Sequence, residues 1–160
     1  VNEATALAIW SDYGPIVIRW ERPRRQITIS IVTGSAVKLL TTSSGRIFAA
    51  HLPAAKVQHL IDAEMRDKDF PKQLCSEGAV QKLLAKARRD GLAIVSADHF
   101  ERGIAAASAP VFDAKNEIVF AMSVVGIQGL IDTSLGGLPI TTLRSAARRL
   151  SNKLGQRRNE

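Results

Sequence analysis

Apolar and polar residues form two strand-like runs between Ile104 and Gly126, which read IAAASAPVFDAKNEIVFAMSVVG. The runs are joined by DAKNE, where Asp113 can accept hydrogen bonds from its own backbone and Asn116 tolerates a left-handed conformation. The pattern therefore predicts a β-hairpin. Because side chains alternate between the faces of a strand, the returning strand is expected to present two sets of residues. These are Ile118, Phe120, Met122 and Val124 on one face, and Val119, Ala121, Ser123 and Val125 on the other.

The second of these sets consists mostly of small residues, and Ala106 and Ser108 are equally small on the first strand. One face of the hairpin therefore leaves space that either a packed helix or a small ligand can fill. From these residues alone, the packed helix is the favoured interpretation, because sheets are commonly covered by helices.

Further strands are predicted on both sides of a helical region. β-Rich runs at 4–11 and 15–21 form a first hairpin, 27–32 alternates as a third strand, and 92–96 is a fourth. Apolar stripes predict helices over 54–67 and 76–90, with Ser76 as N-cap and Gly91 just past the end. The last helix runs from about Pro139 to Gly155, followed by a frayed tail at 156–160. This order favours an α+β fold with a largely antiparallel six-stranded sheet covered by helices.

A short helix is predicted to open at Ser43 or Ser44, which can serve as its N-cap, and to close at Pro53. Two hydroxyl groups and Gly45 at a helix start present unpaired amides and the positive end of the helix dipole. Such a place favours a carboxylate or phosphate. Alone this signal is weak, because most helix starts of this kind are only caps.

The composition fits one soluble domain over residues 1–160, with 46% hydrophobic and 23% charged residues. A single cysteine, Cys75, allows no disulfide within the chain, which favours a cytoplasmic protein. No apolar run approaches the ~20 residues that a membrane span requires. The net charge of +7 comes from scattered basic pairs, without a recognition-helix motif, so direct DNA binding by these residues is not expected. The chain starts near a predicted strand and without Met, which suggests a piece of a longer protein, or a protein that lacks a disordered or cleaved start.

No catalytic constellation stands out. The three histidines (His51, His59 and His99) lie in different contexts and lack the spacing of metal ligands. Acidic residues between Asp62 and Asp69 alternate with basic ones, as on a solvated helix face. Cys75 precedes a helix start, where a thiol can be activated, but such a cysteine is more often merely partly buried. We therefore expect no enzyme activity, no metal and no cofactor.

Three stretches resemble the effector-binding domain of bacterial transcription factors of the IclR type. TTSSGRIFAAHLP is similar to the family pattern A-T-x-x-G-[KR]-x-x-L-A-x-L-P, GLAIVS matches a family strand, and ERGIAAASAPVFDAKNEIVFAMSVVG resembles the family hairpin. The resemblance covers nearly the whole chain. It implies a GAF/profilin-like fold, a homodimer or tetramer, and an N-terminal winged helix-turn-helix, absent from these residues, through which the protein contacts DNA.

The resemblance also implies a ligand pocket. The family's helix-opening positions correspond to Ser43, Ser44 and Gly45. A loop position that is often Asp corresponds to Ser96, or to Ala97 with an offset of one residue. The family's hairpin Cys corresponds to Ala106, and its S-x-S pair corresponds to Ser123 and Val125.

These differences from the family pattern remove polar hydrogen-bond partners from the pocket, so we expect a small organic acid with an apolar or aromatic body as effector. With the resemblance, a ligand over the small-residue face becomes the favoured interpretation. Two alternatives remain. One is a stand-alone GAF-like sensor or small enzyme that uses Cys75 or a histidine, and the other is a dimerisation module with a vestigial pocket.

Overall fold

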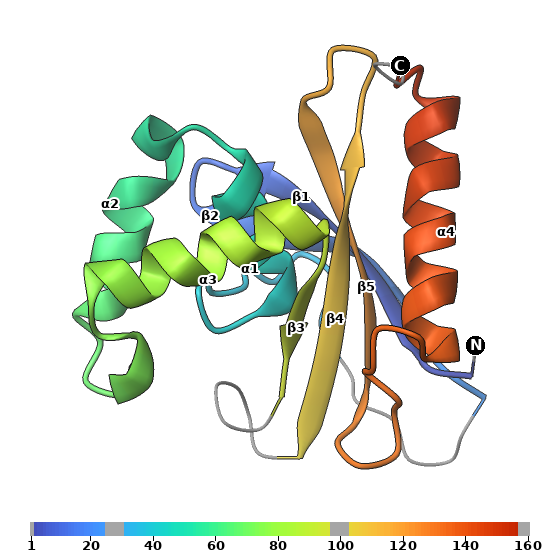
Figure 1. The fold of residues 1–160 in the computed structure, drawn as a ribbon, viewed down its shortest axis with the longest axis horizontal. Helices are drawn as coiled ribbons and strands as arrows, with labels where there is room; N and C mark the ends of the chain where they lie inside the picture. The colour runs from blue at the N-terminus through green and yellow to red at the C-terminus, as the bar shows by residue number, and fades with distance from the viewer. Residues whose placement is uncertain (1, 25–30, 97–102, 157–160) are drawn as a thin grey trace.

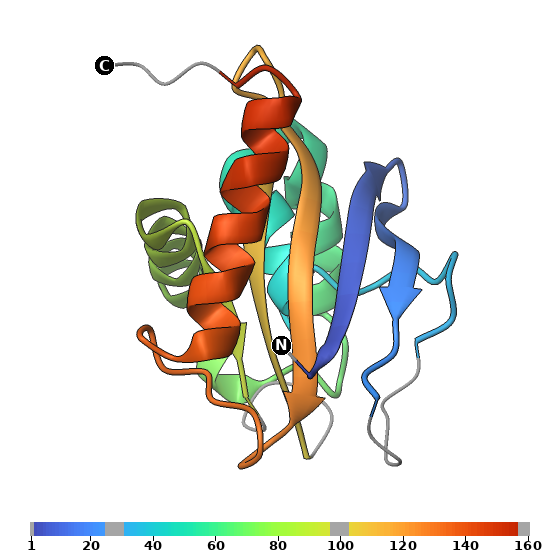
Figure 2. The same ribbon diagram turned by 90° about the vertical axis from the view of Figure 1, so that its right-hand side faces the viewer.

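A twisted antiparallel sheet with helices on both faces forms the centre of the protein (Figures 1 and 2). The computed structural model describes residues 2–24, 31–96 and 103–156. The sheet has five strands in the order β2-β1-β5-β4-β3. Helix α4 covers one face, and α1 covers the other, with α2 and α3 beyond it. In chain order the elements are β1 (Ala4–Ser11), β2 (Gly14–Glu21), α1 (Ser43–His51), α2 (Ala54–Met65), the 3-10 helix η1 (Lys72–Leu74), α3 (Glu77–Asp90), β3 (Ala93–Val95), β4 (Ile104–Phe112), β5 (Ile118–Ile127) and α4 (Leu138–Lys153).

The predicted hairpin is β4 and β5, and its turn has the predicted chemistry. Asp113 Oδ1 accepts hydrogen bonds from the amides of Lys115 at 2.8 Å and Glu117 at 3.0 Å. Asn116 adopts a φ of 60°, in the left-handed region. The α+β fold class and this hairpin are therefore confirmed.

A shift in register near the turn changes the face of one residue. Phe112 pairs with Ile118 and Val111 pairs with Phe120, so β5 has one extra residue there. Ile118 consequently joins the core beneath α1, together with Ala121. The prediction that Ile118 shares a face with Phe120 is wrong for this reason.

The predicted sixth strand is not found among the described residues. That segment, 27–32, lies largely outside them, and Ile31 and Val32 at its end are not in a strand. The predicted tail at 156–160 is described only at Gln156, whose side-chain amide donates to Asn116 Oδ1 at 3.2 Å.

Both faces of the sheet are packed through small residues. On one face, Ala105, Ala107 and Ala109 of β4 lie against Ile140, Leu143 and Ala147 of α4. On the other face, Ile47, Phe48 and Ala50 of α1 lie against Ala8 and Ala121. Alanines let each helix axis approach the sheet closely. A packed helix therefore does cover part of the small-residue face of the hairpin, and this helix is α1.

Candidate ligand-binding site

A chain of three buried hydroxyl groups joins the start of α1 to the hairpin. Ser108 Oγ on β4 donates to Ser43 Oγ at 2.7 Å and lies 2.7 Å from Ser123 Oγ on β5. Their exposed fractions are 0% for Ser108 and 4% for each of the other two. Because a hydroxyl has one proton and Ser108 gives its own to Ser43, Ser123 must donate to Ser108. The proton of Ser43 is then free to be donated at the start of α1. We call Ser43, Ser108 and Ser123 the serine cluster.

The other hairpin residues predicted for the pocket lie beside the serine cluster. Ala106 and Val125 are cross-strand partners, one position along the same face from the Ser108–Ser123 pair. Val95 pairs with Ala106, which brings the half-buried Ser96 to the edge of this group. Residue 97, the alternative to Ser96, lies outside the described residues.

The N-cap of α1 differs from the prediction. Thr42 caps the helix, because its Oγ1 accepts a hydrogen bond from the amide of Gly45 at 3.0 Å. Ser43 and Ser44 are instead the first two helical residues, since Ser43 is held by Ser108. Among the described residues, the amides of Ser43 and Ser44 have no hydrogen-bond acceptor, whereas the Gly45 amide is already paired. Two of the three predicted anion-binding amides thus remain available.

Gly45 has a packing role that was not predicted from the sequence. A Cβ atom there would lie 2.2 Å from the carbonyl oxygen of Lys38 and 2.5 Å from that of Leu39. Any side chain would therefore push α1 away from the preceding backbone. Gly45 serves to let the helix start pack against residues 38–40.

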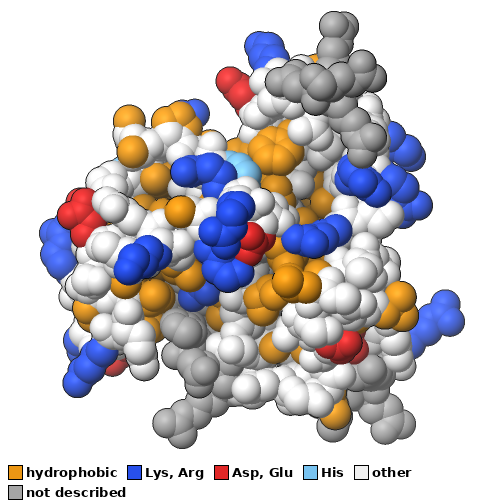
Figure 3. Space-filling model, in the orientation of Figure 1, with side chains coloured by type: hydrophobic (Ala, Val, Ile, Leu, Met, Phe, Trp, Pro, Cys, Tyr) orange, Lys and Arg blue, Asp and Glu red, His pale blue; other side chains and the backbone are white. Residues whose placement is uncertain are grey.

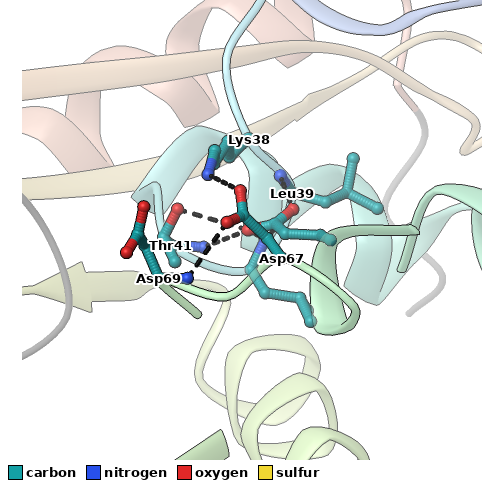
Figure 4. A network of polar contacts seen from close by, with 7 residues as sticks. Lys38, Leu39, Thr41, Asp67 and Asp69 are labelled. Atoms are coloured by element: carbon teal, nitrogen blue, oxygen red, sulfur yellow. Dashed lines mark hydrogen bonds and ion pairs between the residues drawn. The ribbon is translucent and has the colours of Figure 1, made fainter. Parts of the chain in front are cut away.

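Residues 38–41 are held in place by a network of polar contacts (Figure 4). The Glu64 carboxylate at the end of α2 accepts hydrogen bonds from the amides of Leu39 at 2.6 Å and of Leu40 and Thr41 at 3.1 Å. The Thr41 hydroxyl donates to the same carboxylate at 3.2 Å. The prediction of a solvated acidic face is therefore wrong for Glu64, which sets the position of the backbone that leads into α1.

An ion pair closes this network at the surface. Lys38 Nζ lies 2.8 Å from Asp67 Oδ2, and Asp67 Oδ1 accepts from the amide of Asp69 at 3.0 Å (Figure 4). The hydrogen bond with Asp67 raises the pKa of Lys38, and the same bond lowers the pKa of Asp67. Both groups are solvent-exposed, so the pair contributes little stability and mainly orients the loop.

Two residues of this region were missed from the sequence. Ser108 was recognised as small, but its hydroxyl links the two predicted serines, and its place opposite Ser123 in the hairpin was the available signal. Arg46 is the other, because a guanidinium following a glycine on a short helix gives no sign of burial. Its exposed fraction is only 4%.

The titratable residues that the structure describes form no reactive constellation around the serine cluster. Burial, followed by the nearby charge of Arg88, lowers the pKa of His51 to about 4, and its ring lies edge-on to Phe112. Cys75 is exposed, and its thiol donates to the carbonyl oxygen of Pro71. His99 lies outside the described residues. Among the residues that are described, no three His, Cys, Asp or Glu side chains lie close enough together to hold a metal ion.

A cavity of about 400 Å³ lies on the opposite face of the sheet from α1. It is bounded by Leu7, Met122 and Val124 of the sheet and by Leu143 and Leu150 of α4, with Arg19 and Glu21 at its rim. Ser123 of the serine cluster also lines this cavity, between Met122 and Val124, whose side chains pack with residues of α4.

Residues 1–152 match the family described as bacterial transcriptional regulator IclR, C-terminal. The chain belongs to this family. Its IclR-type domain is 29% identical, over 132 residues, to the uncharacterised HTH-type transcriptional regulator RhmR of Escherichia coli strain K12; the match covers 79% of this chain and 50% of RhmR. The chain thus spans about half the length of that curated relative.

Solved structures show the same relationship. The crystal structure of Pseudomonas aeruginosa HmgR has a TM-score of 0.86 and 31% identity, covering 97% of this chain and 60% of that one. The Thermotoga maritima IclR structure has a TM-score of 0.79 at 23% identity, covering 96% and 62% respectively, and supports the fold alone. The chain therefore has the fold and the family membership of the C-terminal domain of IclR-type regulators. Within the described parts of the chain, no helix combines the length and apolarity needed to cross a membrane.

Proposed function

We propose that this IclR-type domain binds a small organic acid and, through this binding, controls the DNA affinity of a cytoplasmic transcriptional regulator. Its family consists of regulators, and the chain corresponds to 60% of HmgR and 50% of RhmR. The DNA contact is assigned to an N-terminal winged helix-turn-helix, and residues 1–160 to one effector-binding domain that also forms a homodimer or tetramer. The domain itself has no enzyme activity in this proposal.

The observation that carries the proposal is the direction of the serine cluster. Its hydroxyl chain runs from Ser123 through Ser108 to Ser43, and the proton of Ser43 is left to donate beside the free amides of Ser43 and Ser44. These three donors belong to the first turn of α1, at the positive end of its dipole, and such a helix start favours a carboxylate. A carboxylate bound at this point would receive charge-assisted hydrogen bonds in a region from which water is largely excluded.

The rest of the proposed site is less polar. Ala106 and Val125 would form an apolar wall, Ser96 would add one hydrogen bond at the edge, and Gly45 would let α1 approach closely. Such a lining suits an acid whose body is apolar or aromatic, because a hydroxy or oxo group would lose its hydrogen bonds to water without replacement.

The regulatory step would be a shift between two quaternary arrangements. The serine cluster connects α1 to β4 and β5, so an acid bound at Ser43 would change the contacts between this helix and the sheet. A ligand shifts such an equilibrium only through its different affinity for the two arrangements. Helix α1 is the element whose position the acid would bias.

Calorimetric titration against a panel of aliphatic and aromatic acids tests the proposal. Ser43→Ala removes the terminal hydroxyl, and the affinity for the best acid should fall about tenfold. Ser151→Ala is the matched control, since Ser151 is similarly buried and its hydroxyl is likewise hydrogen-bonded, accepting from the Phe112 amide and donating to the Ala147 carbonyl. Equal affinity in the Ser43 variant, or tight binding of only glyoxylate-like acids, would count against the proposed site.

A second function has one observation in its favour. Two of the three hydroxyl groups of the serine cluster already donate within the cluster, as they would in a dimerisation module with a vestigial pocket. The melting temperature distinguishes the two, because a ligand that binds the native state must raise it. Failure of every acid in the panel to do so would favour the vestigial pocket.

A further inference from the structure

Arg46 is a buried cation whose hydrogen-bonding capacity is only partly used. Its exposed fraction is 4%. The Nε atom donates to the carbonyl oxygen of Leu40 at 2.6 Å, and Nη1 donates to that of Ile94 at 3.2 Å. The Nη2 atom is buried and has no hydrogen-bond partner. Buried guanidinium donors are normally paired, so this atom identifies a place where a partner is missing.

No carboxylate among the described residues contacts this guanidinium group. The charge of Glu64 is felt by Arg46, but that carboxylate is bound to the amides of residues 39–41. Burial lowers the pKa of Arg46 to about 10, so the side chain stays charged at neutral pH. The net positive charge at this point of α1 therefore lacks an anion in contact.

A cavity of about 180 Å³ adjoins Arg46, between α3 and the outer edge of β3. Lys86 and Asp90 also line its polar side. Its apolar lining includes Leu83, Leu92 and Leu135. None of its lining residues belongs to the serine cluster. It is large enough for several water molecules, at about 30 Å³ each, or for one small organic molecule.

The lining selects among possible occupants. Asp90 is paired with Lys86 and Arg89, and the hydrogen bond from Lys86 lowers its pKa, so it stays ionised. A dianion such as hydrogen phosphate would be repelled by this carboxylate, while a monoanion at Nη2 is more easily tolerated. The leucines require a hydrocarbon body. A short aliphatic carboxylate meets both conditions.

The surroundings would also attract an anion. Helix α4 carries Arg144, Arg148, Arg149 and Lys153 and no acidic residue. Figure 3 shows Lys and Arg side chains gathered over the face that carries α3 and α4. A predominantly positive surface raises the local concentration of small anions.

We propose that the Arg46 cavity is a second ligand site, in which the buried Arg46 side chain turns Nη2 toward the cavity and hydrogen-bonds a short aliphatic carboxylate whose chain lies against the leucines. The site goes beyond the function proposed above, since it uses other residues and takes a smaller ligand. Lys86 lies beside the carboxylate as an additional positive charge.

Titration of the arginine-labelled chain with sodium butyrate, followed by NMR at constant ionic strength, tests this site. The Arg46 Nη2 protons should shift and saturate. Arg46→Lys should weaken butyrate binding at least tenfold, and Lys86→Gln should weaken it three- to tenfold. If the Arg46 variant fails to fold, the Lys86 variant still decides.

Lys82→Gln is the matched control, because Lys82 is an exposed residue of the same helix that does not line the cavity. It should change the affinity less than twofold. Ser43→Ala should leave this affinity unchanged, so that failure here is distinct from failure of the serine cluster. Unmoved Arg46 signals, equal effects of the two Lys variants, or equal affinity for butyrate and inorganic phosphate would overturn the proposal.

Discussion

Replacing Glu64 with Gln should destabilise the protein by about 2–4 kcal/mol. The carboxylate accepts hydrogen bonds from three backbone amides and one hydroxyl, at 2.6–3.2 Å. A hydrogen bond to a charged group contributes about 1.5–3 kcal/mol, and a buried amide left unpaired costs about 1–3 kcal/mol. Gln keeps one accepting oxygen but turns its NH₂ group toward these donors. Leu40 is fully buried, so water cannot easily replace the lost acceptor. The expected loss is smaller than the sum because the loop can relax.

Urea unfolding followed by circular dichroism measures this loss of unfolding free energy. The slope of that free energy against urea concentration should be the same in both proteins, which shows that the folded and unfolded states themselves are unchanged. Asp62→Asn is the control. It removes the same charge from the same helix, but Asp62 is exposed, and among the described residues its side chain accepts only from Gln58 Nε2 at 2.8 Å. Its effect should stay within about 0.5 kcal/mol. A loss for Glu64→Gln no larger than that of Asp62→Asn would refute the assigned role of Glu64.

Two further predictions follow from residues around α1. Gly45→Ala should lower the free energy of unfolding in urea by about 2–4 kcal/mol, because its Cβ would meet backbone carbonyls. Gly78→Ala in α3 has open space around it and should be neutral or stabilising. Equal effects of the two substitutions would contradict the close approach at Gly45. Since burial lowers the pKa of His51 to about 4, the ring contributes stability in full above about pH 6.5 and loses it as the pH falls toward 4. After discounting for partial exposure, this amounts to about 1–2 kcal/mol. His51→Phe should flatten the pH dependence of the melting temperature in this range. An unchanged profile would show that this pH dependence comes from other groups.

The sequence was sufficient to predict the hairpin turn and the ends of α3, because these depend on interactions between neighbouring residues. Asp113 and Asn116 marked the hairpin turn, and Ser76 and Gly91 marked the two ends of α3, where the Ser76 hydroxyl accepts from the Ala79 amide and Gly91 adopts a φ of 57°. Each depends on a side chain and backbone within four residues. Such interactions leave their pattern in the sequence itself.

Interactions between distant segments account for what was missed. Thr42, Ser43 and Ser44 can all cap a helix. Thr42 is the cap in the structure, and Ser43 instead hydrogen-bonds Ser108, 65 residues away. Glu64 finds its amide partners 23 to 25 residues earlier in the chain. A bulge that depends on the pairing of two strands moved Ile118 to the other face.

The candidate site was likewise predicted where local patterns determine it and missed where distant segments meet. Ala106, Ser123 and Val125 were placed on one face by alternation alone, and the structure puts them side by side on the face that α1 covers. The meeting of Ser43 with that face depends on how α1 packs, which only the resemblance to a family indicated. A glycine is needed at position 45 because the backbone of residues 38–40 passes close to it, and no local sequence pattern indicates that path.

The central claim is that an organic acid binds at the start of α1. Backbone NMR titration with the best acid of the panel tests it most directly. The account predicts that the amides of Ser43 and Ser44 shift downfield and saturate together, while the Ala79 amide, already capped by Ser76, stays in place. Saturable binding that leaves the Ser43 and Ser44 amides unmoved would contradict the account.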